Sequence, residues 1–125
     1  MKLSVIIPAY NERDTILTVI EQVRRLPIDT ELIVVDDGST DGTQEVLAAA
    51  AASADPAFKV LFQDRNRGKG AAIRRGLRAV TGDAVVIQDA DMEYDPGDLI
   101  RLLEPIEKGD AAVVYGSRIL GRNPR

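Results

Sequence analysis

Five short runs of almost continuous apolar residues recur along the chain, and each is followed by polar residues. The runs are KLSVII at 2–7, ELIVV at 31–35, FKVLF at 58–62, AVVIQ at 84–88 and AAVVY at 111–115. Strands of a parallel sheet read this way because both of their faces are buried. Parallel strands also need long crossover connections. The runs therefore restrict the chain to an α/β fold with a covered, mostly parallel sheet.

Segments that favour helix fill the crossovers. The expected helices are 13–26, a second that follows the turn at 38–40 and ends in the Ala-rich stretch 48–52, a third over about 70–80 and a fourth that opens at Pro96. In the first, an apolar stripe at i, i+3, i+4 and i+7 begins at Ile16, and Pro27 stops the helix. The order βαβαβαβαβ predicts a Rossmann-like sheet with helices on both faces. Because we find no repeat and no linker, residues 1–125 are predicted to form one domain.

Local signals predict how two helices begin and how a third packs. Asn11, with Asp14 three residues later, resembles a capping box for the first helix. Ser39 or Thr40 is expected to cap the second helix through its hydroxyl group. Gly76 is expected to mark close packing of the third helix rather than a functional position.

The composition removes several classes of chemistry. The 125 residues include no Cys and no His, which excludes disulfides, thiol nucleophiles, the usual zinc sites and imidazole acid–base catalysis. Any metal must then be a hard ion with oxygen ligands, such as Mg²⁺ or Mn²⁺. The apolar run at 3–7 is too short for a signal peptide, and no run approaches the roughly 20 apolar residues of a membrane span. We expect a cytoplasmic protein, free or at the cytoplasmic face of the membrane.

The charge is unevenly distributed along the chain. The net charge of −4 argues against a nucleic-acid partner. Residues 65–78 nevertheless hold six basic side chains, and residues 83–110 hold nine acidic ones. A basic segment next to an acidic one suits an anionic ligand that is held partly through a cation. Two solvated helix faces of opposite sign would give the same pattern.

Polar residues gather where the predicted strands end. In a parallel α/β sheet, ligands bind beyond the carboxyl ends of the strands. Residues 8–12 follow the first strand, 36–39 the second, 89–91 the fourth and 116–118 the fifth. The sequence therefore predicts a ligand cleft at this edge of the sheet.

Asp89 and Asp91, separated by Ala90, come directly after the buried fourth strand. On an extended chain, residues i and i+2 point the same way, so both carboxylates can approach one site. A divalent cation would relieve their repulsion. Aspartates also commonly end strands and begin turns. The second acidic pair at the same edge favours the metal site.

Three further features of this edge suggest ligand contacts. Residues 36–39 (DDGS) form either a helix cap and turn or an acceptor for base N–H and ribose hydroxyl groups. Tyr10, in one loop with Glu12, either stacks on a base or packs against a neighbouring helix. The basic, Gly-containing loop 65–70 suits phosphate contacts before a helix, although its glycine spacing matches neither the P-loop nor the dinucleotide fingerprint.

Five motifs, in order and at matching spacing, make the chain resemble the family 2 glycosyltransferases, which have a GT-A fold. They are VIIPAYNE at 5–12, VVDDGSTDGT at 34–43, RNRGKGAAIRRGL at 65–77, DAD at 89–91 and YGSR at 115–118. Within the family, the chain looks most like the polyprenyl-phosphate sugar synthases, such as the dolichyl-phosphate mannose synthases. The resemblance covers almost the whole chain.

The resemblance implies a binding site for a GDP- or UDP-linked sugar. The residues that would bind it are Pro8, Ala9, Tyr10, Glu12, Asp37, Gly38, Lys69, Asp89, Ala90 and Arg118. Asp89 and Asp91 would hold Mg²⁺ or Mn²⁺ at the diphosphate. Glu93, where mannose synthases have Gln, is a further candidate metal ligand. Asp91 and Arg118 are the candidate catalytic residues, with Arg118 on the diphosphate.

The resemblance also implies a reaction, the metal-dependent transfer of a sugar with inversion to a polyprenyl (dolichyl-type) phosphate or a glycan in cell-envelope glycan synthesis. A lipid phosphate is already an anion, whereas a hydroxyl acceptor needs a general base. The whole protein is expected to associate peripherally with the membrane. The resemblance is to the donor-binding half of such enzymes, so we expect residues 1–125 to bind nucleotide and metal but to transfer sugar poorly.

Three other classes were compared with the same residues. A truncated sugar-nucleotide-binding or oligomerisation module would share the donor site without catalysis, and turnover by a longer chain would separate the two. Receiver- or phosphatase-type phosphotransfer domains place clustered Asp residues after the first strand, where this chain has Pro8-Ala9-Tyr10. Nucleotidyltransferases need a Gly-rich basic loop at that place, and the sequence has none there.

Overall fold

The computed structural model describes residues 2–52, 55–90, 113–115 and 118–121, the last two ranges as backbone. The elements in chain order are β1 (Lys2–Ala9), α1 (Ile16–Arg24), β2 (Asp29–Asp36), α2 (Thr43–Ala51), β3 (Phe58–Phe62), α3 (Lys69–Leu77), β4 (Ala84–Ile87), β5 (Val113–Tyr115) and β6 (Arg118–Gly121). The helix predicted from Pro96 lies outside the described residues. None of the helices described is long and apolar enough to cross a bilayer.

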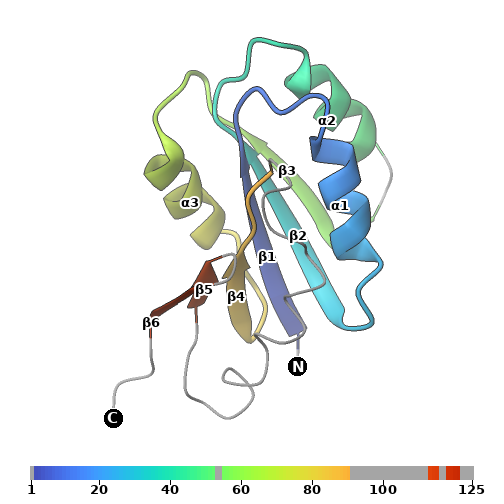
Figure 1. Ribbon diagram of the computed structural model, residues 1–125, viewed down its shortest axis with the longest axis vertical. Coiled ribbons are helices and arrows are strands. Elements are labelled where there is room, and N and C mark those ends of the chain that lie inside the picture. The colour runs from blue at the N-terminus through green and yellow to red at the C-terminus, as the bar shows by residue number, and fades with distance from the viewer. Residues whose placement is uncertain (1, 53–54, 91–112, 116–117, 122–125) are drawn as a thin grey trace.

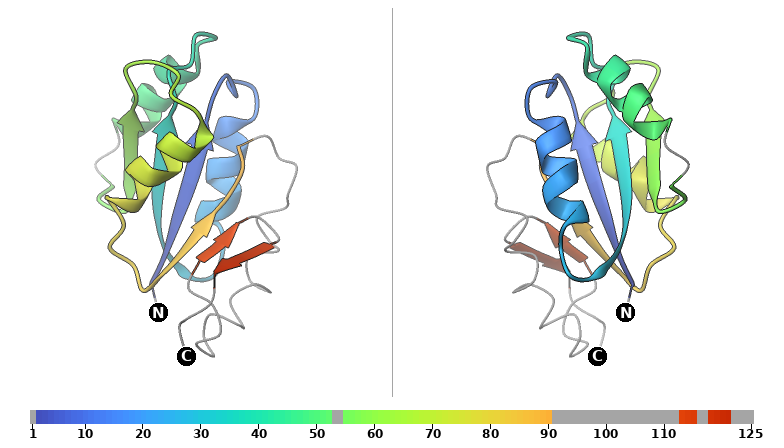
Figure 2. Two further views of the ribbon diagram at one scale, coloured as in Figure 1. Left: turned by 90° about the vertical axis from the view of Figure 1, so that its left-hand side faces the viewer. Right: turned by 90° about the vertical axis from the view of Figure 1, so that its right-hand side faces the viewer.

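The described strands form one sheet in the order β3-β2-β1-β4-β5-β6. β1 pairs in parallel with β2 and β4, β3 and β5 extend the parallel sheet, and β6 runs antiparallel to β5. Helices α1 and α2 cover one face and α3 covers the other (Figures 1 and 2). The predicted fold class is therefore confirmed. β6 was not predicted from the sequence; it is an antiparallel edge strand of a kind that is common on parallel sheets.

Element boundaries differ from the predictions by a few residues. β3 has the predicted bounds, whereas β1 runs on through Pro8 and Ala9. Ala9 O accepts a hydrogen bond from Asp37 N at 2.8 Å, so the ladder between β1 and β2 continues to the edge where the polar residues gather. α1 is shorter than predicted, from Ile16 to Arg24, because the residues before it form the turn that leaves β1.

The predicted helix caps are wrong. Thr15 is the N-cap of α1 and Gly42 that of α2, and neither helix has a side-chain cap bond. Asn11 instead adopts a left-handed conformation (φ 53°), and its Oδ1 accepts a hydrogen bond from Thr40 N at 2.8 Å. Ser39 Oγ accepts one from Asn11 N at 2.9 Å. These side chains join two loops because their hydroxyl and amide groups reach backbone groups across the edge of the sheet.

Side chains along each central strand alternate between two packing layers. The larger layer lies between the sheet and α1 with α2, and it includes the predicted apolar stripe of α1. Burial of each such Val, Leu or Ile contributes about 1.5–3 kcal/mol. On the opposite face, a Cβ at Gly76 would lie 2.8 Å from Ile6 Cγ2, which confirms that this glycine allows α3 to pack closely on β1.

The strand order reverses next to β1. The chain passes from β1 to β2 and β3 on one side, and then crosses to β4 on the other side. In α/β sheets with such a reversal, ligands bind in a crevice at the carboxyl ends of the strands beside it. The fold thus places residues 8–12 and 89–90 at the point where such sheets bind ligands.

Candidate functional site

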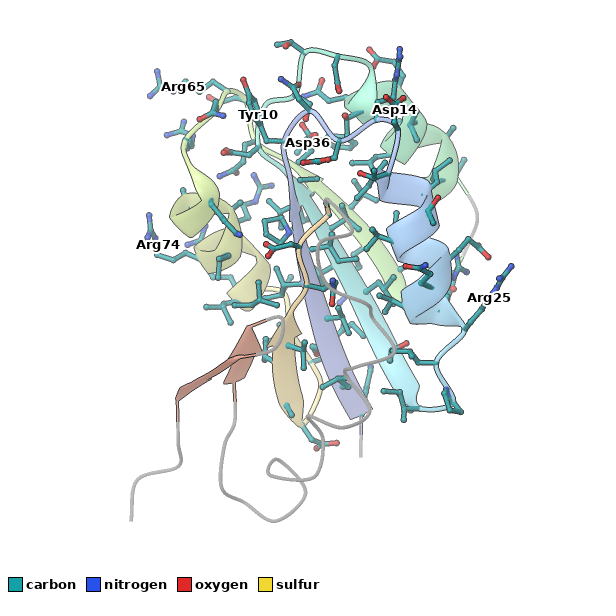
Figure 3. All side chains as sticks on the ribbon, viewed as in Figure 1. Tyr10, Asp14, Arg25, Asp36, Arg65 and Arg74 are labelled. Atoms are coloured by element: carbon teal, nitrogen blue, oxygen red, sulfur yellow. The ribbon has the colours of Figure 1, made fainter. Side chains whose placement is uncertain are left out.

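A cleft of about 260 Å³ lies at the carboxyl edge of the sheet, between the ends of β1 and β4 and the start of α3. Its lining consists of Pro8, Ala9, Tyr10, Glu12, Asp37, Asn66, Gly68, Lys69, Ala72, Asp89 and Ala90. Tyr10, Asp36 and Arg65 all lie at the same end of the molecule in Figure 3. Among the residues whose side chains the structure describes, every one predicted to bind the nucleotide sugar lines the cleft except Gly38.

The other predicted site residues are Gly38, which lies behind the cleft, and three residues whose side chains the structure does not describe. Gly38 has φ +75°, and a Cβ there would lie 2.4 Å from the backbone of Arg65 and Asn66, so it allows a loop to pass close behind the cleft. Arg118 is the first residue of β6, and only its backbone is described. Asp91 and Glu93 lie outside the described residues, and their roles stay predictions.

Asp37 binds the loop that precedes α3. Its Oδ1 accepts a hydrogen bond from Arg67 N at 2.8 Å and its Oδ2 accepts one from Gly68 N at 2.9 Å. The residue is buried and still lines the cleft. Each carboxylate oxygen can accept more than one hydrogen bond, so Asp37 can also contact a ligand. Its first function in the fold is to hold the basic loop at the cleft.

Asp36, the other member of the acidic pair, faces α2. Its Oδ2 accepts hydrogen bonds from Ser39 N at 3.0 Å and from Gln44 Nε2 at 2.9 Å. Its Oδ1 is buried and has no hydrogen-bond partner among the described residues. The two interpretations of the DDGS motif therefore apply to different residues, because Asp36 stabilises the turn while Asp37 lines the cleft.

The loop after β1 presents Tyr10 and Glu12 to the cleft. Glu12 N donates a hydrogen bond to Thr43 Oγ1 at 3.1 Å. Asn11, which lies between Tyr10 and Glu12, is held by its own hydrogen bond to Ser39. Tyr10 lines the cleft, and the residue is 45% exposed. A ring with this much free surface can stack on a planar ligand, so the arrangement suits the stacking interpretation better than packing against a helix.

Thr15 connects the two sides of the cleft. Its Oγ1 lies 2.7 Å from Ala90 O and 3.1 Å from Glu12 Oε2. The single hydroxyl proton can be donated to one of these acceptors at a time. No sequence signal indicates this contact, since a polar residue before a helix normally indicates a cap.

Lys69 and Asp89 form an ion pair inside the cleft. Asp89 is nearly buried, whereas half of the Lys69 side chain is exposed. The contact shows that the Asp89 carboxylate faces a position that accepts positive charge. Lys69 is the first residue of α3, so the N-terminal end of that helix, which favours negative charge, borders the cleft.

These residues fit a hard divalent cation. Mg²⁺ is commonly bound by one or two carboxylates together with substrate phosphates, so Asp89 and a bound diphosphate would supply suitable oxygens. Among the residues that the structure describes, no group of three or more acidic side chains is arranged to hold a metal ion. The other predicted ligands, Asp91 and Glu93, follow Asp89 outside the described residues.

Three lining residues were not predicted as site residues. Gly68 lies in the loop that was expected to contact phosphate, with φ +99°. Asn66 precedes it in that loop, and Ala72 is a fully buried residue on the inner side of α3. Neither carries a sequence signal, because a loop amide and a helical alanine occur at many positions without a function.

The parallel sheet, the helices on both faces and the cleft at the reversal of strand order define a Rossmann-like α/β ligand-binding domain. Comparison with known proteins identifies the family. The glycosyl transferase family 2 model matches residues 4–124, so the chain belongs to that family.

The most similar relatives include lipid-linked sugar transferases. Undecaprenyl-phosphate 4-deoxy-4-formamido-L-arabinose transferase of Pseudomonas fluorescens (strain Pf0-1) is 36% identical over 122 residues, which are 93% of this chain and 36% of that protein. The protein of the same name from Yersinia pestis (strain Pestoides F) is 36% identical over 112 residues, 86% of this chain and 34% of its own length. The chain thus spans about a third of the length of these curated relatives.

Solved structures share the fold, which is GT-A. A mannosyltransferase from Pyrobaculum calidifontis, in complex with GDP-Man and Mn²⁺, has a TM-score of 0.69 and 33% identity over 78% of this chain and 30% of its own. Glucosyl-3-phosphoglycerate synthase from Mycobacterium tuberculosis, in complex with UDP, has a TM-score of 0.69 and 35% identity over 88% of this chain and 41% of its own. The family and fold expected from the sequence motifs are confirmed.

Proposed function

We propose that this chain binds the nucleoside-diphosphate sugar for a metal-dependent, inverting glycosyl transfer to a polyprenyl phosphate. The observation that carries the proposal is the convergence of Tyr10, Glu12, Asp37, Lys69 and Asp89 on one cleft at the reversal of strand order. The aromatic ring of Tyr10 suits the base of such a donor, and the hydrogen-bond acceptors suit its ribose. The lysine beside a carboxylate suits its diphosphate.

The cleft residues divide into two groups in this proposal. Pro8, Tyr10 and Glu12, at the end of β1, contact the nucleoside. Lys69 and the start of α3 contact the diphosphate, where a positive side chain and the positive end of the helix dipole favour phosphate oxygens. Asp89, with Asp91, holds Mg²⁺ or Mn²⁺, which when bound neutralises charge on the leaving diphosphate.

Inversion follows from a single displacement at the anomeric carbon. An acceptor oxygen forms a bond to that carbon from the face opposite the diphosphate, and the bond from the carbon to the diphosphate oxygen breaks. The nucleoside diphosphate leaves with the electron pair, and Lys69 stabilises its charge. A phosphate acceptor is already ionised, so this transfer requires no general base.

The proposed ligands are supported by the relatives. Two similar proteins are named as transferases of undecaprenyl phosphate, and similar solved structures contain GDP-Man with Mn²⁺ or UDP. Because the chain spans about a third of those relatives, we propose that residues 1–125 form the donor-binding part and turn over slowly alone. We also propose that the reaction takes place at the cytoplasmic face of a membrane.

Calorimetric titration of the chain with UDP and with GDP, each with and without Mn²⁺, tests the proposal. We expect one nucleotide to bind more tightly, with an affinity that depends on Mn²⁺. Asp89→Ala and Asp91→Ala should each weaken that binding by at least about tenfold. Asp14→Ala, which removes a carboxylate that is exposed and outside the cleft, is the control and should bind normally.

Two results would contradict this proposal. Binding of neither nucleotide to a folded chain would show that the cleft does not form a donor site by itself. Nucleotide binding with equal affinity in the presence of a chelator, unchanged in both aspartate variants, would remove the metal from the proposal. The preferred base would also restrict the sugar that the donor carries.

A further inference from the structure

A second groove, of about 590 Å³, lies along α3 beside the end of β3. Its lining consists of Phe62, Gln63, Asp64, Arg67, Ala71, Arg74, Arg75 and Arg78. Four of these eight residues are arginines and one is acidic, in a chain whose net charge is −4. We propose that this surface, called here the arginine groove, docks the protein on an anionic lipid bilayer.

The geometry of α3 directs the arginines away from the core. Ala71, Arg74, Arg75 and Arg78 follow one another at i, i+3, i+4 and i+7, which places them on one side of the helix. Gly76 is buried against the sheet on the other side. Figure 3 shows Arg74 projecting outward from α3. The helix therefore presents a basic stripe to the surroundings.

Two of the guanidinium groups have no partner within the described part of the chain. Arg67 pairs with Asp64 at 3.0 Å, and Arg75 Nη1 donates to Gln63 Oε1 at 2.7 Å. Within the same described ranges, no hydrogen bond or ion pair involves the side chains of Arg74 and Arg78. A guanidinium group binds phosphate through two parallel N–H donors, so these two arginines can each hold a headgroup phosphate.

Apolar side chains border the arginine groove. Phe62, which lines it, and Leu77, which follows Arg74 by three residues on α3, are each 39% exposed. They are two of the four large apolar side chains that are exposed among the described residues. Basic residues next to exposed Phe and Leu are typical of surfaces that lie in a membrane interface. Binding of a small soluble anion would not bury these exposed apolar side chains, whereas contact with a bilayer would.

The position of the groove agrees with the proposed reaction. We choose a bilayer rather than a soluble polyanion as its partner because of that reaction, so this choice rests on the proposed function. A polyprenyl phosphate resides in a membrane, so its phosphate must reach the cleft from the bilayer surface. The loop before α3 belongs to both sites, because Arg67 lines the arginine groove while Asn66 and Gly68 line the cleft. Docking through the groove would bring headgroups close to the phosphate-binding side of the cleft.

Vesicle flotation tests this inference on the full chain. The vesicles contain phosphatidylcholine alone, or equal parts of phosphatidylcholine and phosphatidylglycerol. We expect binding to the acidic vesicles only, weakened by added NaCl. Arg74→Ala with Arg78→Ala should lower the partition coefficient by about 25-fold, at about 1 kcal/mol for each basic residue. Arg74→Lys with Arg78→Lys keeps the charge and should retain most of the binding.

The control is Arg13→Ala with Arg25→Ala, which makes the same change of charge on two exposed residues outside the arginine groove. Figure 3 shows Arg25 and Arg74 on opposite sides of the molecule. If the control lowers vesicle binding as much as the groove variant does, net charge rather than this surface is responsible, and the inference is wrong. Absence of wild-type binding to acidic vesicles would also overturn it.

Two further measurements separate this inference from its alternatives. Sedimentation of the wild-type chain tests whether the groove instead joins two copies. If the wild-type chain self-associates but does not bind vesicles, and the groove variant does not self-associate, the proposal that the groove docks on a bilayer is wrong. Titration of the groove variant with the preferred nucleotide and Mn²⁺ should match the wild type, so a failure of docking and a failure of donor binding can be told apart.

Discussion

Lys69 and Asp89 face each other across the cleft from the start of α3 and the end of β4. The ammonium group of Lys69 pairs with the Asp89 carboxylate, which we propose as a ligand of a divalent cation. In the absence of nucleotide, the ammonium group and the metal ion would therefore compete for this carboxylate. A bound diphosphate offers the ammonium group other oxygens. We therefore expect Lys69 to oppose the binding of metal alone and to favour the binding of metal together with nucleotide.

Lys69→Met tests this competition. We expect the affinity for Mn²⁺ alone to rise about fivefold, which corresponds to an ion pair worth about 1 kcal/mol. The affinity for nucleotide with Mn²⁺ should fall, because the diphosphate loses a cation. Both are measured by calorimetry, with Arg25→Met as a control of equal charge outside the cleft. A fall in the affinity for Mn²⁺ alone would show that Lys69 supports the metal site.

Gly38 permits the close approach of the loop that Asp37 holds. In Gly38→Ala, the new Cβ would meet the backbone of Arg65 and Asn66 at 2.4 Å, at a residue with φ +75°. We expect a loss of about 2 kcal/mol or more of folding free energy in urea unfolding, together with weaker nucleotide binding. Gly70→Ala is the control, because its Cβ would meet only the end of Arg74 at 3.3 Å. Equal stability of both variants would contradict this packing.

At the scale of elements, a buried carboxylate joins three strands at the edge opposite to the cleft. Glu31 of β2 accepts hydrogen bonds from Ser4 of β1 at 2.6 Å, Lys59 of β3 at 2.9 Å and Thr81 N at 2.8 Å. Burial raises the pKa of Glu31, but these hydrogen bonds outweigh it and lower the pKa from 4.5 to about 2. The network fixes the register of the strands whose other ends form the cleft.

This carboxylate makes the stability of the fold depend on pH. Since the pKa of Glu31 is lower in the folded chain, the unfolded chain binds more protons between pH 4.5 and 2. The stabilisation, about 3 kcal/mol, is present above pH 4.5 and is lost as the pH falls toward 2. Thermal unfolding should show this loss in the wild type and in Glu21→Gln, an exposed control, but much less of it in Glu31→Gln. If the melting temperatures of all three proteins fall equally with decreasing pH, Glu31 is not the cause of this loss of stability.

At the scale of the whole molecule, the cleft is assembled from segments that are far apart in the sequence. Residues 8–12, 66–72 and 89–90 come together with Asp37 only because β1 lies between β2 and β4. The arginine groove uses the opposite side of the same helix, α3, that borders the cleft. One helix thus connects the proposed donor site to the proposed membrane surface, and its loop is held by Asp37.

A large part of the fold and of the cleft could be predicted from local sequence patterns. Apolar runs had to become buried parallel strands, the stripe that begins at Ile16 had to pack on the sheet, and Gly76 had to mark a close contact. Polar residues directly after the strands had to lie at one edge, because parallel strands end together. The family followed from motifs that this topology holds in place. The element boundaries moved by a few residues because tertiary hydrogen bonds, such as Asp37 N to Ala9 O, extend the strands.

The sequence by itself determined the α/β sheet, the edge that holds the cleft and most residues that line it, since burial and strand direction depend on local pattern. Only the tertiary structure decided which partner each polar group has. Asn11 and Ser39 join loops rather than cap helices, Asp37 holds the loop before α3, and Thr15 reaches Ala90. A hydrogen bond between residues distant in sequence depends on where the packed core places both groups, and no local pattern specifies that position.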